Sequence, residues 1–123
     1  MSGNKMIEFE NLIMIEVLKA MQELGGRVTR KEVRREIRNH SDVISEEQVD
    51  KIKQSKKTGK EYQPFIYRFN FAVKHLITTG YIFTENNHDL ELSEKGRMVD
   101  FEKFDPIHDV RSIVDGSLND EID

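Results

Sequence analysis

Apolar residues are spaced along the chain in a way that predicts several helices followed by two short strands. Residues 9–24 are rich in Leu, Ile, Met and Val, contain no Gly or Pro, and end at Gly25-Gly26, a pattern that predicts a helix. Its apolar positions lie on more than one face: Leu12, Ile13, Met14, Ile15, Val17 and Leu18. Such a helix either forms the centre of the core or also contacts a second chain, and the second alternative implies a homodimer.

Two capping-box patterns predict where the next helices begin. Thr29 is followed three residues later by Glu32, and Ser45 by Gln48. In such a box the hydroxyl accepts a hydrogen bond from a free backbone amide, and the later side chain reaches back to the cap residue. The first of these helices is expected to end near residue 39, and the second, shorter one near residue 53.

A longer helix is predicted after Pro64, a residue that suits the first helical position. Its apolar positions recur at helical spacing: Phe65, Phe69, Ala72, Val73 and Leu76. Gly80 ends this helix, and the period then changes to two, so that residues 81–84 and 90–92 predict strands around a polar turn. A further short helix is expected to follow Ser93 and to end near residue 103.

This order of elements is typical of a winged helix-turn-helix, a mainly α-helical fold with a small β-hairpin. In that fold the helix before the hairpin usually enters the major groove of DNA. We therefore expect a DNA-binding domain over residues 1–104. Residues 105–123 are mostly polar and acidic and predict an acidic tail or interdomain linker.

The distribution of charge supports an anion-binding surface. The chain has a formal net charge of −4, but residues 27–74 carry a net +6 between an amino-terminal part of −2 and a carboxy-terminal part of −8. A basic segment inside an acidic chain is typical of a local binding site for phosphates.

Most arginines of the basic segment fall in the helix predicted after Thr29. On a helical wheel its cations share one arc, while Glu32 and Glu36 lie on the far side. Segregated cations raise the local potential over a phosphate backbone, although a solvated surface would show the same pattern. The candidate phosphate-binding residues here are Arg30, Lys31, Arg34, Arg35 and Arg38.

Five lysines with no acidic residue among them occupy residues 51–60, and residues 55–62 predict a polar loop. The lysines form either a mobile, solubilising loop or a flexible arm that binds phosphates. The candidates for phosphate contact are Lys56, Lys57 and Lys60.

The outward face of the helix after Pro64 suits the reading of base edges. Arg can hold guanine and Asn can hold adenine. The candidates are Tyr67, Arg68, Asn70 and Lys74, whereas Phe71 is expected to pack against a neighbouring helix. The turn of the predicted hairpin has no Lys or Arg, so the hairpin is either a structural prop or a reader of DNA shape that uses Asn86, Asn87 and His88.

Several chemistries are excluded by what the sequence lacks. There is no Cys, no zinc-binding spacing of His, no phosphate loop and no nuclease-type Glu-x-Lys motif. We therefore expect no catalysis, no metal site and no cofactor. No apolar run reaches the roughly 18 residues of a membrane helix, and no signal peptide precedes Met6, so we expect a cytoplasmic protein with no membrane partner.

Three separated blocks resemble the amino-terminal domain of Mrr-type restriction proteins. They are residues 16–32, residues 65–72 with Leu76 and Thr79-Gly80-Tyr81, and residues 92–97 with the sequence Leu-Ser-Glu-Lys-Gly-Arg. The resemblance spans about residues 12–100.

The resemblance implies a winged-helix module that binds duplex DNA ahead of a covalently linked nuclease domain acting on modified, often methylated, DNA. Arg68 matches an Arg of the family, and Phe71 matches a Trp. The chain departs from the family by lacking a nuclease half and basic residues in the hairpin turn. Two alternatives are a winged-helix transcriptional regulator that binds a palindrome as a dimer, and a winged-helix adaptor that binds proteins.

Overall fold

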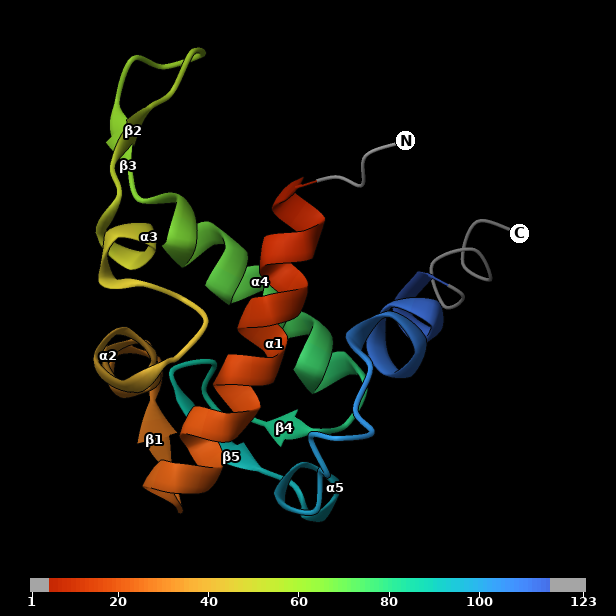
Figure 1. Ribbon diagram of the computed structural model, residues 1–123. Helices are drawn as coiled ribbons and strands as arrows, with labels where there is room; N and C mark the ends of the chain where they lie inside the picture. The colour runs from red at the N-terminus through yellow and green to blue at the C-terminus, as the bar shows by residue number, and fades with distance from the viewer. Residues whose placement is uncertain (1–4, 116–123) are drawn as a thin grey trace.

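The central element is helix α1 (Lys5–Leu24), which crosses the molecule in front of α4 in the computed structural model, where residues 5–115 are described (Figure 1). It begins at Lys5 instead of Phe9, four residues earlier than predicted. Its side chains Ile13, Met14 and Val17 are buried, because α2 and α4 both pack against it. Of the other apolar positions predicted on this helix, Leu18 is buried as well, whereas Leu12 is 39% exposed.

The two predicted capping boxes are confirmed. Thr29 Oγ1 accepts a hydrogen bond from Glu32 N at 3.1 Å, and Glu32 Oε1 accepts one from Thr29 N at 2.8 Å, so α2 (Arg30–His40) starts where expected. Ser45 caps α3 (Glu46–Asp50) with Gln48 in the same way. Helix α3 ends earlier than predicted, because the chain enters a strand at Lys53.

Helix α4 (Pro64–Thr78) has the predicted buried face. Phe65, Phe69, Ala72, Val73 and Leu76 are all fully buried. These side chains pack on α1, and their burial is the main hydrophobic contribution of this helix to stability. Gly80, with φ +86°, lets the chain leave the helix toward the next strand.

The predicted hairpin is present as β4 (Ile82–Phe83) and β5 (Asp89–Leu92), which pair antiparallel. A third strand, β1 (Val28–Thr29), was not predicted; it pairs with β5 and gives the order β1-β5-β4. Two residues are too few to show a strand period, so only pairing identifies β1.

A second hairpin lies where a loop was predicted. Strands β2 (Lys53–Gln54) and β3 (Glu61–Tyr62) pair antiparallel, with Lys53 opposite Tyr62. This hairpin projects from the body of the molecule between α3 and α4 (Figure 1, top left). The polar sequence of residues 55–60 gives no alternating pattern that would have indicated it.

The carboxy-terminal part differs most from the sequence expectation. Helix α5 (Glu94–Arg97) starts after Ser93 as predicted but is only one turn long. Residues 105–115, expected in a tail or linker, include the π-helical turn η1 (Ile107–Arg111), whose Val110 is fully buried against the core. The first part of the expected tail is therefore packed on the domain, while its remainder lies outside the described residues.

The architecture is mainly helical with small antiparallel sheets, in agreement with the predicted class. Among residues 5–115 there is no helix with the length and apolar character needed to cross a membrane.

Candidate nucleic-acid interface

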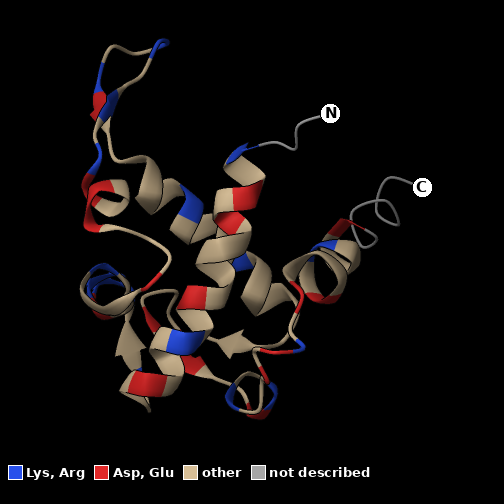
Figure 2. Ribbon diagram, in the orientation of Figure 1, with Lys and Arg blue, Asp and Glu red and all other residues tan. Residues whose placement is uncertain are grey.

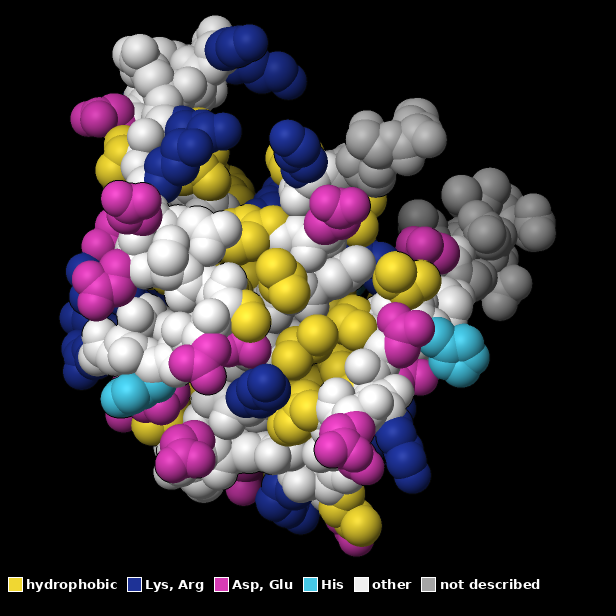
Figure 3. All heavy atoms as spheres, in the orientation of Figure 1, with side chains coloured by type: hydrophobic (Ala, Val, Ile, Leu, Met, Phe, Trp, Pro, Cys, Tyr) yellow, Lys and Arg dark blue, Asp and Glu magenta, His cyan; other side chains and the backbone are white. Residues whose placement is uncertain are grey.

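The cations of α2 form a basic part of the described surface. Figure 2 shows α2 end-on at the left, with much of its ribbon in the blue of Lys and Arg. Figure 3 shows Lys and Arg side chains in dark blue along the same edge of the molecule. Lys31 and Arg35 are exposed. The Arg34 guanidinium lies 5.3 Å from the centroid of the buried Phe69 ring, and burial lowers the pKa of Arg34. This cation–π contact fixes Arg34 between α2 and α4.

Arg30 joins three elements of the candidate surface. Its Nη1 donates to Asn70 Oδ1 on α4 at 3.1 Å, its Nε donates to the Asn87 carbonyl at 3.0 Å, and its Nη2 donates to Asn87 Oδ1 at 3.0 Å. Asn87 lies in the turn between β4 and β5, with φ +63°. The amino end of α2, the outer face of α4 and the hairpin turn are therefore held as one surface.

Burial and a neighbouring cation both act on the charge of Arg30. Burial, and then repulsion from the neighbouring Arg34, lower the pKa of Arg30 from its ordinary value. The lowered pKa means that desolvation and a like charge both disfavour the charged form of this guanidinium. A phosphate bound near both side chains would relieve this repulsion.

The outer face of α4 carries aromatic and polar side chains. Tyr67 is 54% exposed, and Asn70 and Lys74 are exposed as predicted. The prediction that Phe71 packs against a neighbouring helix is wrong, because its side chain is 42% exposed. Its ring lies instead 4.9 Å from the Arg68 guanidinium carbon.

Arg68 lies toward α1 and not on the outer face of α4. Its Nη1 is 3.0 Å from Glu10 Oε2, and its side chain is only 23% exposed. Glu10 is buried and also contacts Arg111 and His75. A guanidinium bound to a buried carboxylate has its charge compensated, and this ion pair joins Arg68 of α4 to Glu10 of α1, away from the face where the contact with guanine is expected.

Arg38 is also compensated within the molecule. Its Nε and Nη2 donate to the two carboxylate oxygens of Asp50 at 2.9 and 2.7 Å, and Glu46 lies 3.6 Å from Nη2. The hydrogen bond and charge of Asp50, and then the charge of Glu46, raise the pKa of Arg38 despite some desolvation. Arg38 therefore offers little free charge to a phosphate until Asp50 is displaced.

Lys56, Lys57 and Lys60 lie in the tip of the β2–β3 hairpin and are exposed. The tip is ordered by hydrogen bonds from Ser55 N to the Lys60 carbonyl at 2.8 Å and from Gly59 N to the Ser55 carbonyl at 2.9 Å. The structure thus places these lysines in a hairpin with paired strands.

The turn between β4 and β5 is stabilised by its own side chains. Asn86 Oδ1 accepts hydrogen bonds from His88 N at 2.9 Å and Asp89 N at 2.8 Å. Arg27, from outside the hairpin, lies 3.9 Å from Glu91. The asparagines expected as readers of shape therefore have internal roles, in closing the turn and in holding Arg30.

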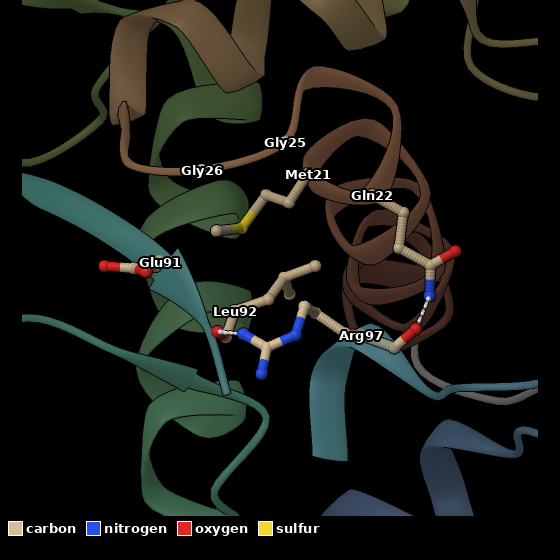
Figure 4. A pocket seen from close by; sticks show the side chains of 7 residues that line it. All are labelled: Met21, Gln22, Gly25, Gly26, Glu91, Leu92 and Arg97. Atoms are coloured by element: carbon tan, nitrogen blue, oxygen red, sulfur yellow. Dashed lines mark hydrogen bonds between the residues drawn. The ribbon is translucent and has the colours of Figure 1, made fainter. Parts of the chain in front are cut away.

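A groove of about 350 Å³ lies between the Gly25-Gly26 turn and α5 (Figure 4). Its lining residues are Met21, Gln22, Gly25, Gly26, Glu91, Leu92 and Arg97. Arg97 Nη1 donates to the Leu92 carbonyl at 3.0 Å, and Gln22 Nε2 donates to the Arg97 carbonyl at 3.3 Å, so these groups hold α5 onto β5 and α1. Within the described residues, no three His, Asp or Glu side chains come together as a potential metal site.

Comparison with known families shows what the chain is similar to. A model described as the Mrr N-terminal domain matches residues 11–102, and this agrees with the three blocks of resemblance found in the sequence. No curated protein and no solved structure matches the chain.

Proposed function

Since this chain belongs to the family of Mrr N-terminal domains, we propose that it binds duplex DNA and serves as the targeting module of an Mrr-type restriction system. The observation that carries the proposal is the basic surface of α2, with exposed Lys31 and Arg35, which Arg30 joins to the outer face of α4. Cations segregated beside a helix face with polar and aromatic side chains suit a groove lined by phosphates.

The order of the elements supports a winged helix-turn-helix arrangement. Helices α2 and α4 would form the helix-turn-helix, β4 and β5 the wing, and β1 the third strand of the small sheet. Helix α4, which directly precedes the wing, would lie in the major groove. A helix is about 10–12 Å wide and the major groove about 12 Å wide, so the two shapes are complementary.

The side chains divide into two roles in this proposal. Lys31, Arg34 and Arg35 would bind phosphates and position the domain, because they carry charge without a fixed base-reading geometry. Asn70, Tyr67 and Lys74 would face base edges. Arg30 would support both groups by fixing Asn70, whereas Arg38 and Arg68 are left out of the proposed contacts.

We further propose that the domain selects DNA, by sequence or base modification, and leaves cleavage to a nuclease domain in a longer parent. A methyl group on cytosine or thymine lies in the major groove, where apolar side chains contact it. Exposed Tyr67 and Phe71 on α4 support a role of this kind.

The first prediction concerns the salt dependence of DNA binding. The variant Lys31→Gln/Arg35→Gln should reduce the slope of log affinity against log salt by about 1.8, because each lost phosphate contact contributes about 0.9. At about 0.15 M salt this corresponds to a loss of roughly 30-fold in affinity. Mobility shifts or fluorescence anisotropy with a duplex of about 25 base pairs would measure it.

The matched control is Lys19→Gln/Lys103→Gln, which removes the same charge elsewhere. Lys19 lies over the Phe101 ring at 5.6 Å and 3.9 Å from Glu16 on its own helix, and Lys103 follows Phe101 in the segment before η1. The control should keep the wild-type slope. Equal slopes for all three proteins, or wild-type binding that does not change with salt, would contradict the proposed function.

A second prediction is a gain of affinity on removing an acidic side chain. Asp50→Asn removes the charge that compensates Arg38 and should raise DNA affinity roughly fivefold at about 0.15 M salt, with a slope steeper by about 0.9. Stability should change little, because both side chains are exposed and such pairs contribute little. Glu102→Gln, with the same change in net charge, should leave the affinity unchanged, and an equal gain there would show a nonspecific charge effect.

A further inference from the structure

The β2–β3 hairpin is a part of the fold that core packing does not explain. Residues 53–60 have the sequence Lys-Gln-Ser-Lys-Lys-Thr-Gly-Lys, in which no side chain is apolar, and none is buried. The hairpin projects away from the helices (Figure 1). A two-stranded hairpin is at best marginally stable alone in water, so burial of apolar surface is not what this segment provides.

The base of the hairpin is fixed to the surface that we propose binds DNA. The Tyr62 ring meets the exposed Tyr67 ring of α4 edge-on, with centroids 5.5 Å apart and planes at 83°. Gln63 Nε2 donates a hydrogen bond to the Val49 carbonyl of α3. The hairpin therefore starts beside the outer face of α4, in a direction set by α3 and α4.

The register of the hairpin separates its acidic residue from α4. Lys53 lies opposite Tyr62, and Gln54 lies opposite Glu61. Because successive side chains of a strand point to opposite sides, Lys53 shares the side of Tyr62, and Glu61 lies on the other side. The tip adds three exposed lysines, of which only the last is followed by an acidic residue, Glu61: Lys56, Lys57 and Lys60.

The charge of the two hairpins is opposite. The β4–β5 hairpin, which occupies the position of the wing, carries Glu85, Asp89 and Glu91 and no Lys or Arg between residues 84 and 92. Carboxylates at a wing tip are repelled by phosphates. The β4–β5 hairpin is therefore poorly suited to bind a DNA backbone. The lysines of β2–β3 supply the charge that it lacks.

We infer that the β2–β3 hairpin is a second phosphate-binding element of this domain, which takes the place of the acidic wing and binds the DNA backbone that flanks the groove occupied by α4. The inference rests on the proposed function. Lys57 lies five positions before Tyr62, and because residues 56–58 form a turn, the tip extends at most about 17 Å from the base, the length of five fully extended residues. The tip therefore lies beyond the base of the hairpin and can contact phosphates that the outer face of α4 does not reach.

The test compares the variant Lys56→Gln/Lys57→Gln with the α2 variant and the Lys19→Gln/Lys103→Gln control in the full chain. The hairpin variant should lower the salt slope on a duplex of about 25 base pairs by about 1.8, and the control should not. In the wild-type protein, the duplex should also protect Lys56, Lys57 and Lys60 from an amine-acylating reagent, detected by mass spectrometry, while Lys103 stays reactive. The second measurement needs no substitution and is independent of the folding of any variant.

The outcomes separate the two proposals. If the wild-type chain shows no salt-dependent binding, the proposed function fails and the hairpin assignment fails with it. If the wild type binds, the α2 variant weakens binding, and the hairpin variant keeps the wild-type slope with its lysines still reactive, only the hairpin assignment is overturned. A lowered slope together with protected lysines supports it.

Discussion

Replacing Glu10 by glutamine should lower the free energy of unfolding by about 3 kcal/mol, because it leaves cations without their buried counter-charge. Glu10 Oε1 accepts a hydrogen bond from Arg111 Nη2 at 2.7 Å and lies 3.3 Å from His75 Nε2, while Oε2 pairs with Arg68 Nη1 at 3.0 Å. The Glu10 side chain is 4% exposed. Removing one partner from a buried ion pair typically costs about 3–5 kcal/mol, and we take the lower end because both arginines reach water in part.

Denaturant unfolding of Glu10→Gln against Glu23→Gln would measure this effect. Glu23 is an exposed residue of the same helix, and its substitution should change stability by less than about 0.5 kcal/mol. Because Arg111 belongs to η1, amide exchange over residues 106–115 should also become faster in Glu10→Gln. Equal stability of the two variants would show that Glu10 does not hold α1, α4 and η1 together.

The acid dependence of this contribution has a definite sign. Burial alone would raise the pKa of Glu10, but hydrogen bonds from His75 and Arg111, with their charges, hold the pKa below the ordinary value of 4.5. A lowered pKa in the folded state means that the stabilisation is fully present above about pH 4.5 and is lost as the pH falls through the lowered pKa. The difference in stability between wild type and Glu10→Gln should therefore shrink below pH 4.5.

Local rules of helix formation explain what could be predicted from the sequence. The capping boxes at Thr29 and Ser45 depend on residues three positions apart, so they can be recognised from the sequence alone. The buried face of α4 follows from the helical period of its apolar side chains. The change of period after Gly80 likewise indicated β4 and β5.

The partners of the arginines could not be predicted in the same way. Arg68 and Glu10 are 58 positions apart, and a helical wheel of α4 contains no information about a carboxylate on α1. Arg38 and Asp50 are 12 positions apart on different helices, α2 and α3, whose packing decides whether they meet. A helical wheel shows which cations share a side of a helix, but it does not show which of them pair with a carboxylate from another helix.

Short strands and the carboxy-terminal helix were missed for a related reason. Strand β1 has two residues, and β2–β3 has a polar tip, so both are defined by backbone pairing and not by side-chain pattern. Residues 105–115 are acidic in composition, yet the burial of Val110 and the contact of Arg111 with Glu10 hold them on the domain. Two specific contacts thus outweigh a composition that by itself suggests a tail.

Replacing Gly96 by alanine should destabilise the domain by about 3 kcal/mol, at the upper end of the usual cost of overpacking. A Cβ at this position would lie 2.1 Å from the Tyr81 carbonyl oxygen and 2.9 Å from Leu92 Cδ2. The backbone oxygen cannot rotate away, and it also accepts hydrogen bonds from Ser93 N at 3.0 Å and Ser93 Oγ at 3.1 Å. The methyl group would therefore separate α5 from the start of the β4–β5 hairpin.

Whether Gly96→Ala lowers or raises the free energy of unfolding distinguishes the steric clash from the effect of helix propensity. In an open helical position, alanine in place of glycine stabilises by up to about 1 kcal/mol. Glu94→Ala in the same helix is exposed and serves as the control, with an expected change within about 0.5 kcal/mol. A Gly96→Ala protein as stable as wild type in denaturant unfolding would show that α5 can move off Tyr81 without cost. A loss as expected would explain why the Ser-Glu-Lys-Gly turn requires its glycine: α5 packs directly against backbone.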